Sequence, residues 1–267
     1  MLRGLGLFAL VNALAERLRG VFVPYFRHLL DLCIAYLSGI SAGEGTKKKR
    51  RRKSAGANEA VDSSAEPTPA PEAWRLRLRV LRALQRAMLY DAPPGSDARL
   101  LDEACFERLL PALAAQLPEH PPEGEAAHAV EAEATADAAL EASLQSLVAE
   151  GGDEAAPGTD AFGRAVVACL SQLAVAAGSD AQWKPLNYAL LMATRATEPR
   201  TRLLALYGVS QLQARLAEEY LVLLPETLPY LAELLEDGEH EVEAGATELL
   251  RRLEKLSGES LAEYLKP

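Results

Sequence analysis

The chain has 267 residues and a formal net charge of −10, with 49% hydrophobic and 25% charged residues, as is usual for globular proteins. Aromatic residues make up only 6%, whereas Ala, Leu and Glu dominate, and these three are good helix formers. No run of 18 or more apolar residues occurs, so we expect no membrane-spanning helix. The composition predicts an all-α protein.

The charge is distributed unevenly along the chain. Residues 1–99 contain 17 Lys and Arg against 9 Asp and Glu, whereas residues 100–267 contain 11 against 29. Each phosphate that a protein neutralises needs a Lys or Arg without a competing carboxylate nearby. We therefore expect any contact with RNA to lie toward the N-terminus and not in the acidic C-terminal part.

Residues 1–40 are expected to form an N-terminal helical pair. Residues 1–15 have an early Arg, an apolar stretch and an Ala-Leu-Ala end, as a short signal peptide does, but helical spacing continues to Arg19 and favours an amphipathic helix. A second apolar stripe follows at steps of three and four residues, the spacing that places side chains on one face of a helix. Its members are Phe22, Phe26, Leu29 and Cys33.

Residues 41–73 are rich in Lys, Arg, Ser, Ala and Pro and are expected to be a disordered linker. The linker contains seven consecutive cations, which small residues flank: Lys47, Lys48, Lys49, Arg50, Arg51, Arg52 and Lys53. Nuclear import is the favoured role of such an exposed block. The alternatives are nonspecific binding of nucleic acid or acidic surfaces, and a merely solubilising linker.

Residues 74–117 are expected to form a second helical pair. The alternation in Trp74–Val80 is typical of a strand, but helical steps continue through Leu84 and Met88, and no second strand offers itself for pairing. We therefore predict a helix here.

Four arginines in this helix are spaced by four, three and four residues, which places them on one side: Arg75, Arg79, Arg82 and Arg86. Arg77 is expected to add to this basic face. One interpretation is a solvated helix face with acidic partners elsewhere in the fold. The other is a contact with RNA phosphates or with an acidic protein, since guanidinium forks match the geometry of phosphate.

Residues 118–158 are rich in Glu, Ala, Gly and Pro and are expected to be a second disordered insertion, acidic in character. Its segment from His128 to Glu150 has helical propensity, but the apolar content there is mostly alanine. We expect such a helix to gain little by packing.

Residues 159–267 are expected to form C-terminal HEAT repeats. The four-residue segment that begins at Pro185 lies 42 residues before a similar one at Thr227, and the segment at Glu198 lies 41 residues before a similar one at Glu239, a period typical of HEAT or armadillo units. Asp160 and Asp180 are expected helix N-caps, and two prolines suit a first helical turn. Four apolar stripes support helices here: Val166, Leu170, Leu173, Ala177; Ala205, Val209, Leu212, Leu216; Leu221, Leu224, Leu228, Leu231, Leu235; and Val242, Ala246, Leu249, Leu253, Leu256.

The least generic string is Trp-Lys-Pro-Leu-Asn-Tyr at residues 183–188. Trp183 and Tyr188 are expected to pack between neighbouring repeats. The alternative is an aromatic spot that binds a partner, because Trp and Tyr are enriched where interfaces concentrate their energy.

With this string in place, the chain resembles the C-terminal region of the very large nucleolar HEAT-repeat protein associated with the U-three small nucleolar ribonucleoprotein. Other strings agree in order: residues 14–30, Met88–Asp91, Asp102–Leu117, 223–237 and 241–265. The resemblance is densest from Asp160 onward. Family members are many times longer, and the acidic insertion at residues 118–158 is peculiar to this chain.

The resemblance implies an all-α, HEAT/armadillo-like helical-repeat solenoid with two disordered insertions. It further implies a non-enzymatic scaffold of the nucleus and nucleolus, which supports transcription and early processing of the small-subunit ribosomal RNA precursor within the small-subunit processome. The implied partners are processome proteins and, through them, precursor ribosomal RNA or the small nucleolar ribonucleoprotein, with neither a membrane nor a small-molecule substrate. The alternative is a nuclear transport or general HEAT-repeat adaptor protein without an RNA role.

No motif in the sequence predicts catalysis, a metal site or a cofactor. Residues 39–43 match G-x-S-x-G, but they follow a predicted helix and lead into the charged linker, whereas the hydrolase motif needs a preceding strand. The four histidines lack the paired spacing of metal ligands. The cysteines, Cys33, Cys105 and Cys169, are odd in number and lie in apolar helical patterns, so we expect buried reduced thiols.

Overall fold

The computed structural model describes residues 2–39, 71–93, 95–136, 158–261 and 263–265. Within these residues the regular structure is entirely helical. The longer helices are α1 (Leu2–Leu18), α3 (Leu30–Leu37), α4 (Pro71–Leu89), α5 (Glu103–Ala114), α6 (Glu125–Thr135), α8 (Ala161–Ala177), α9 (Asp180–Ala193), α10 (Pro199–Leu216), α11 (Leu224–Leu234) and α12 (His240–Ser257). The connecting short helices are η1 (Arg19–Val21), α2 (Val23–Phe26), η2 (Arg27–Leu29) and η3 (Ala217–Leu223).

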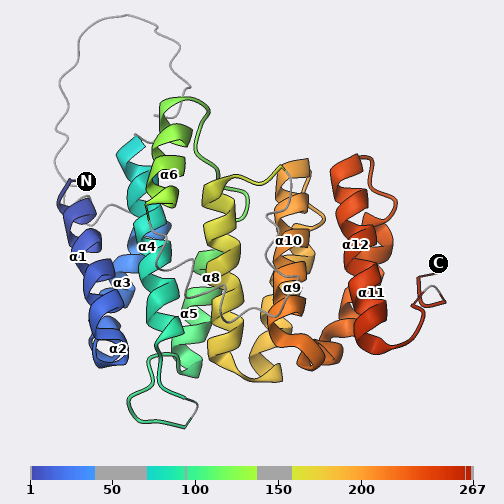
Figure 1. The fold of residues 1–267 in the computed structure, drawn as a ribbon, viewed down its shortest axis with the longest axis horizontal. Helices are drawn as coiled ribbons and strands as arrows, with labels where there is room; N and C mark the ends of the chain where they lie inside the picture. Colours follow the sequence, from blue (N-terminus) through green and yellow to red (C-terminus); the bar gives the residue numbers. More distant parts are fainter. Residues whose placement is uncertain (1, 40–70, 94, 137–157, 262, 266–267) are drawn as a thin grey trace, which may run out of the picture.

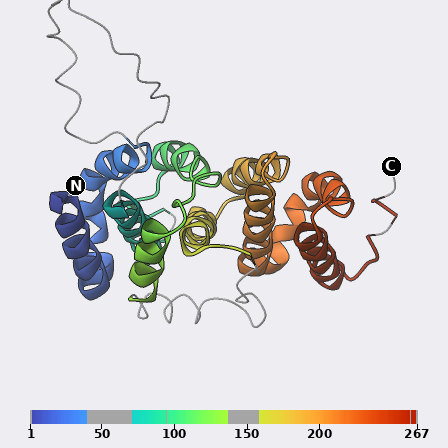
Figure 2. The ribbon, with the colours of Figure 1, turned by 90° about the horizontal axis from the view of Figure 1, so that it is seen from above.

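The helices form two layers that run the length of the molecule (Figure 1 and Figure 2). We call α1, α4, α8, α10 and α12 the front layer, because they face the viewer of Figure 1, and each contacts the next in this order. The back layer consists of α3, α5, α9 and α11, which also follow one another in contact. A layer of helices stacked on a second layer, with contacts between neighbours, is a HEAT-like solenoid.

The repeat found in the sequence corresponds to a structural repeat. The back-layer helix α9 packs against the front-layer helix α10, and α11 packs against α12 in the same way. The front helices α10 and α12 begin 41 residues apart, which is one of the two separations seen in the sequence. The described parts of the three predicted helical blocks join into one stack, because α4 contacts both α1 and α8.

The start signals of three helices agree with their sequences. Asp160 is the N-cap of α8, and its side chain accepts a hydrogen bond of 2.9 Å from the backbone N–H of Gly163. Pro199 and Pro225 lie in the first turns of α10 and α11, where the missing N–H costs nothing. The expectation for Asp180 is wrong by one residue, because Ser179 is the N-cap of α9 and makes no side-chain capping bond.

Three back-layer helices contain an interior proline. These are Pro111 in α5, Pro185 in α9 and Pro229 in α11. A proline at such a position removes one backbone hydrogen-bond donor from the helix. Over the bounds given above, the front-layer helices have no proline beyond their first turn. The two layers therefore differ in the continuity of their backbone hydrogen bonds.

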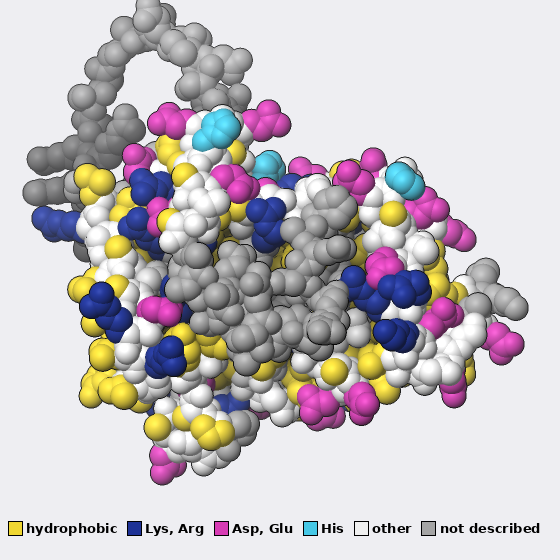
Figure 3. Space-filling model, viewed as in Figure 1, with side chains coloured by type: hydrophobic (Ala, Val, Ile, Leu, Met, Phe, Trp, Pro, Cys, Tyr) yellow, Lys and Arg dark blue, Asp and Glu magenta, His cyan; other side chains and the backbone are white. Residues whose placement is uncertain are grey.

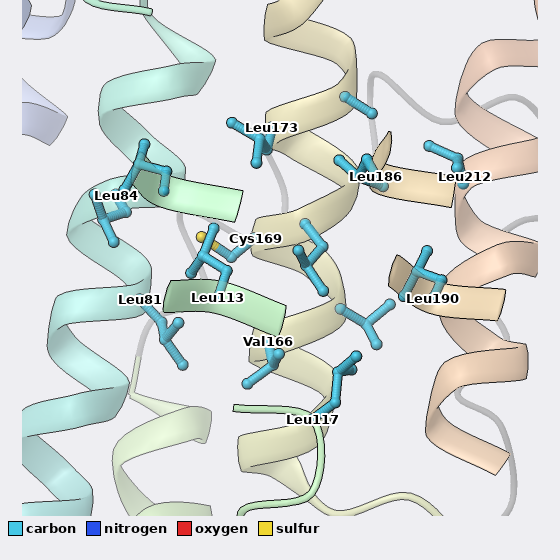
Figure 4. Close-up of a cluster of buried hydrophobic side chains, with 14 of the residues drawn as sticks. Leu81, Leu84, Leu113, Leu117, Val166, Cys169, Leu173, Leu186, Leu190 and Leu212 are labelled. Carbon is cyan, nitrogen blue, oxygen red and sulfur yellow. The ribbon is translucent and has the colours of Figure 1, made fainter. Parts of the chain in front are cut away.

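The core runs between the layers along the whole stack, and Figure 4 shows its centre. Leu81 and Leu84 of α4, Leu113 of α5 and Leu173 of α8 are at most 1% exposed there. The three cysteines are buried and not bonded to one another, as expected. Burial raises the pKa of these thiols above the ordinary value of 9.0, that of Cys105 to about 11, so they are held protonated and unreactive.

The segment Trp74–Val80 is helical, as predicted, because it lies within α4. The apolar side chains of α4 at both helical and alternating positions are buried, since the helix packs between α1, α3, α6 and α8. Contact on several sides explains why its sequence departs from a simple stripe. Residues 2–18 are likewise one helix, with Phe8 and Val11 buried against the stack.

The expectation of a disordered insertion over residues 118–158 is wrong for its first half. Residues 125–135 form α6, which lies on the front layer and contacts α4 and α8 (Figure 2). Its two buried side chains are Ala126 and Val130, so the apolar anchor is small, as the alanine-rich composition suggested. The helix is held largely by charged groups, which apolar periodicity does not reveal.

The end of the stack gives a test of solenoid packing. Leu253 of α12 is fully buried, so Leu253→Ala should lower the free energy of unfolding by about 2–5 kcal/mol through lost burial and a residual cavity. Leu10→Ala is the matched control, because Leu10 is 57% exposed and should change stability by less than about 0.5 kcal/mol. Urea unfolding measures both. Equal midpoints for the two variants would show that α12 is not docked as described.

Candidate functional site

The arginines of α4 face other helices of the same chain. Arg75 and Arg79 point to α6, and Arg82 reaches the C-terminal end of the same helix. Arg86 turns instead to α1. We call Arg75, Arg79 and Arg82 the arginine row.

Glu133 of α6 receives two arginines at once. Its carboxylate accepts hydrogen bonds of 2.6 and 3.1 Å from Arg79 and of 3.0 and 3.1 Å from Arg75. Burial acts to raise the pKa of Glu133, but the hydrogen bonds and charges of Arg79 and Arg75 outweigh it and lower the pKa below 4.5. The carboxylate is therefore ionised at neutral pH, and its side chain is only 13% exposed.

Arg82 binds the backbone at the C-terminal end of α6. Its guanidinium donates to the carbonyl oxygens of Glu133 and Ala134, over 2.7 and 2.6 Å. These carbonyls belong to the last turn of the helix, where the helix dipole places partial negative charge. The arginine row thus binds one carboxylate and one negative helix end, and both mimic the chemistry of an anionic ligand.

Arg86 and Arg77 do not belong to the row. Arg86 is 3% exposed, and its guanidinium donates to Glu16 over 3.1 Å and to Asn12 over 2.6 Å, so it fastens α1 to α4. The expectation that Arg77 adds to the basic face is wrong: its guanidinium stacks 4.8 Å from the ring centre of Trp74 and pairs with Glu119. Arg77 lies two residues from both Arg75 and Arg79, and two residues turn a helix by roughly 200°.

Positive charge is concentrated in the front layer. The five front helices contain 14 Lys and Arg against 6 Asp and Glu, whereas the four back helices contain 2 against 6. Figure 3 shows Lys and Arg side chains on this front face over α1 and α4 and again over α12. Along the sequence, the charged residues divide into a basic first part and an acidic second part. In the folded chain, they divide instead between a basic front layer and an acidic back layer.

Many front-layer arginines are bound to neighbouring turns. Arg200 donates to Asp160 over 2.8 Å, and Arg202 pairs with Asp237 over 2.7 Å, so the first turn of α10 holds the turns on both sides of it. Such bridges align successive repeats. The helix α6, by contrast, contains three glutamates and no Lys or Arg, and this acidic helix lies on the basic layer.

Trp183 and Tyr188 have different surroundings. Trp183 is 7% exposed, and its indole N–H donates to the carbonyl of Ala174 in α8 over 2.9 Å, so it packs between neighbouring repeats. Tyr188 is 55% exposed on the back layer. The partner-binding alternative therefore stays a prediction for Tyr188, whereas Trp183 offers little surface to a partner.

A buried polar cluster lies beside Tyr188. Asn187, Tyr220 and Thr227 come from α9, η3 and α11, and each is at most 1% exposed. The Tyr220 hydroxyl is 2.9 Å from that of Thr227 and donates to the Asn187 side-chain oxygen over 3.3 Å. Burial raises the pKa of Tyr220, so the hydroxyl stays a donor. No periodic pattern in the sequence marks this cluster, although Asn187 and Thr227 lie in the repeated segments.

The remaining expectations concern other kinds of site. The cationic block Lys47–Lys53 lies outside the described residues, as does most of the G-x-S-x-G segment. Where the structure describes the chain, no group of three His, Cys, Asp or Glu side chains converges to hold a metal ion. Over the same residues, none of the helices combines the length and the apolar character that crossing a bilayer requires.

Comparisons with known proteins find similarities over the part of the chain that contains the arginine row. Residues 1–93 match the family model of the BP28CT (NUC211) domain. An uncharacterized Arabidopsis thaliana protein is 37% identical over 263 residues, which are 98% of this chain. The residues that match the domain model contain α1 to α4 and hence the whole arginine row, whereas Glu133 lies beyond them.

Two further relatives carry descriptive names. HEAT repeat-containing protein 1 of Danio rerio is 46% identical over 99 residues, 37% of this chain, and U3 small nucleolar RNA-associated protein 10 of Aspergillus fumigatus is 38% identical over 110 residues, also 37%. Neither name denotes an enzyme. The family model matches the N-terminal residues 1–93, whereas the resemblance seen in the sequence was densest from Asp160 onward. The alignment with the Arabidopsis relative covers both regions.

The chain spans only a small part of these relatives. It covers 10% of the Arabidopsis protein, 5% of the Danio protein and 6% of the Aspergillus protein. The names of these relatives therefore describe proteins many times longer than this chain.

The buried polar cluster gives a test of how the surface around Tyr188 is held. Tyr220→Phe leaves the side-chain oxygen of Asn187 without the Tyr220 donor, so the free energy of unfolding should fall by about 1–3 kcal/mol. Tyr188→Phe removes the same hydroxyl from an exposed ring and should change stability by less than about 0.5 kcal/mol. Denaturant midpoints measured at unchanged slope decide the outcome. A Tyr220→Phe midpoint equal to that of the parent chain would contradict the cluster.

Proposed function

We propose that this chain is a non-enzymatic scaffold of ribosome biogenesis, which acts in the nucleolus as part of the small-subunit processome. The observation that carries the proposal is the BP28CT domain together with similarity to a protein named for its association with U3 small nucleolar RNA. The HEAT-like solenoid supports it, because stacked repeats offer long surfaces on which other macromolecules assemble. In this role the chain supports early processing of the small-subunit ribosomal RNA precursor by holding partners together.

Two features of the described residues suit a scaffold. The front layer is basic and the back layer is acidic. The front face therefore attracts negatively charged partners, and the back face attracts positively charged ones. Tyr188, at 55% exposure, and Met192, at 44%, lie on the same back-layer helix and provide apolar surface for a protein contact. A scaffold with two unlike faces can bind an anionic partner on one side and a protein on the other.

Affinity purification tests the proposal. The tagged full chain, expressed in eukaryotic cells, should recover precursor small-subunit ribosomal RNA, U3 small nucleolar RNA and processome proteins. The matched control is the same tag on an unrelated HEAT-repeat chain of similar net charge. Recovery of nuclear import factors without these RNAs would contradict the proposal and support a transport or adaptor protein.

Nuclear import by the cationic block is the next expectation. Replacing Lys47–Lys53 by alanines should shift a fluorescent fusion, made large enough to prevent passive entry, from the nucleus to the cytoplasm. The control restores import with an unrelated nuclear localisation signal on the substituted chain, and nucleolar accumulation should then return. Unchanged nuclear accumulation of the substituted fusion would show that the block is not the import signal.

A further inference from the structure

We propose that α6 is a removable acidic cover on the arginine row, and that the phosphate backbone of single-stranded RNA binds the row in its place. This inference rests on the proposed function, since it names the chemistry of a partner for the same chain. It concerns three arginines inside the BP28CT domain and one helix outside the matched residues.

The first argument is the way α6 is held. The front-layer helices α4, α8 and α10 each bury ten or more residues, whereas α6 buries only Ala126 and Val130. Its N-cap is Gly124, at φ +95°, which provides no side-chain capping bond. An 11-residue helix with so little apolar contact depends on its partners for stability. It can therefore open without disturbing the stack beneath it.

The second argument is the chemistry of the remaining contacts. Besides its two buried apolar side chains, α6 is attached through Glu133 and the terminal carbonyls to the arginine row. Its Glu131 also lies 3.7 Å from Arg164 and accepts a hydrogen bond of 3.1 Å from the backbone N–H of Ala161. Of these contacts, the more exposed pair of Glu131 and Arg164 weakens most as salt rises. An anion that presents several charged oxygens at once satisfies the same guanidinium groups, because an arginine fork binds phosphate as well as carboxylate.

The third argument is the ratio of charges. Arg75 and Arg79 share the single carboxylate of Glu133, and Arg79 also donates to the Leu5 carbonyl oxygen over 2.8 Å, so the positive charge of this pair is only partly compensated. The guanidinium groups of the row are spaced along α4 at steps of four and three residues, or roughly 6 and 4.5 Å of helix rise. A linear polyanion that lies along α4 places a negative charge beside each of these guanidinium groups, whereas a single glutamate cannot. Such a polyanion also extends onto the rest of the basic front layer. These features favour an RNA strand over an isolated acidic side chain.

Glu133→Gln tests the proposal, because it removes the charge and keeps the shape of the side chain. The matched control is Glu125→Gln, which makes the same change of net charge at an exposed position of the same helix. Both are made in the full chain with Lys47–Lys53 replaced by alanines, so that the cationic block does not dominate RNA binding. The probe is a fluorescein-labelled oligouridylate, and binding is measured by fluorescence anisotropy at fixed salt.

The proposal predicts that Glu133→Gln raises the affinity for the oligouridylate at least about fivefold, whereas Glu125→Gln changes it less than about twofold. Adding Arg75→Gln and Arg79→Gln to Glu133→Gln should abolish the gain. Hydrogen exchange should show that the RNA lowers the protection of residues 125–135 in the parent chain and leaves α8 protected. Circular dichroism confirms that each variant remains folded.

Three outcomes would overturn the proposal. One is an affinity for RNA that is equal in Glu133→Gln and Glu125→Gln. The second is unchanged protection of α6 when RNA is bound, which would place the RNA elsewhere. The third is displacement of α6 by polyglutamate but not by oligouridylate, which would assign the row to an acidic protein. Binding that behaves as predicted, in a chain that recovers no precursor ribosomal RNA from cells, would contradict the proposed function and leave this inference standing.

Discussion

The packing of α8 against helices on both sides holds the described solenoid together. This helix contacts α4 and α6 on one side, α10 on the other, and α5 and α9 behind. Phe162 at its start meets Trp74 edge to face, with ring centres 5.1 Å apart, and the Ala174 carbonyl near its end accepts from Trp183. Because a repeat contacts only its neighbours, weakening α8 would separate the residues that match the BP28CT domain model from the C-terminal repeats.

The balance of charge at the front layer follows from this stack. The helix α4 is fixed between α1 and α8, so the positions of its arginines are set by the core and not by their ligands. Arg86 is compensated inside the stack by Glu16 and Asn12, whereas the arginine row is compensated by α6 from outside. Burying a charge without a partner is costly, so Arg86 requires its partners, but the part-exposed row tolerates an exchange of partner.

The sequence predicted most helices because their apolar side chains recur at helical spacing, as at Val242, Ala246, Leu249 and Leu253 of α12, all of which are buried. It did not predict the docking of α6, because Glu133 is one of many glutamates and nothing local marks it as the partner of α4. The concentration of charge in one layer was also hidden, since successive helices alternate between the layers. The direction of Arg77, by contrast, was available from helical geometry alone.

The interior prolines have a mechanical consequence. Pro111, Pro185 and Pro229 each interrupt the hydrogen-bond ladder of a back-layer helix, whereas the front-layer helices contain no proline beyond their first turns. A two-layer beam bends most easily by deforming its softer layer. We therefore expect this solenoid to have an anisotropic elasticity, in which the back helices flex and the front helices keep their length. An assembly that pulls on such a segment would change its curvature while the spacing of the arginines along α4 stays constant.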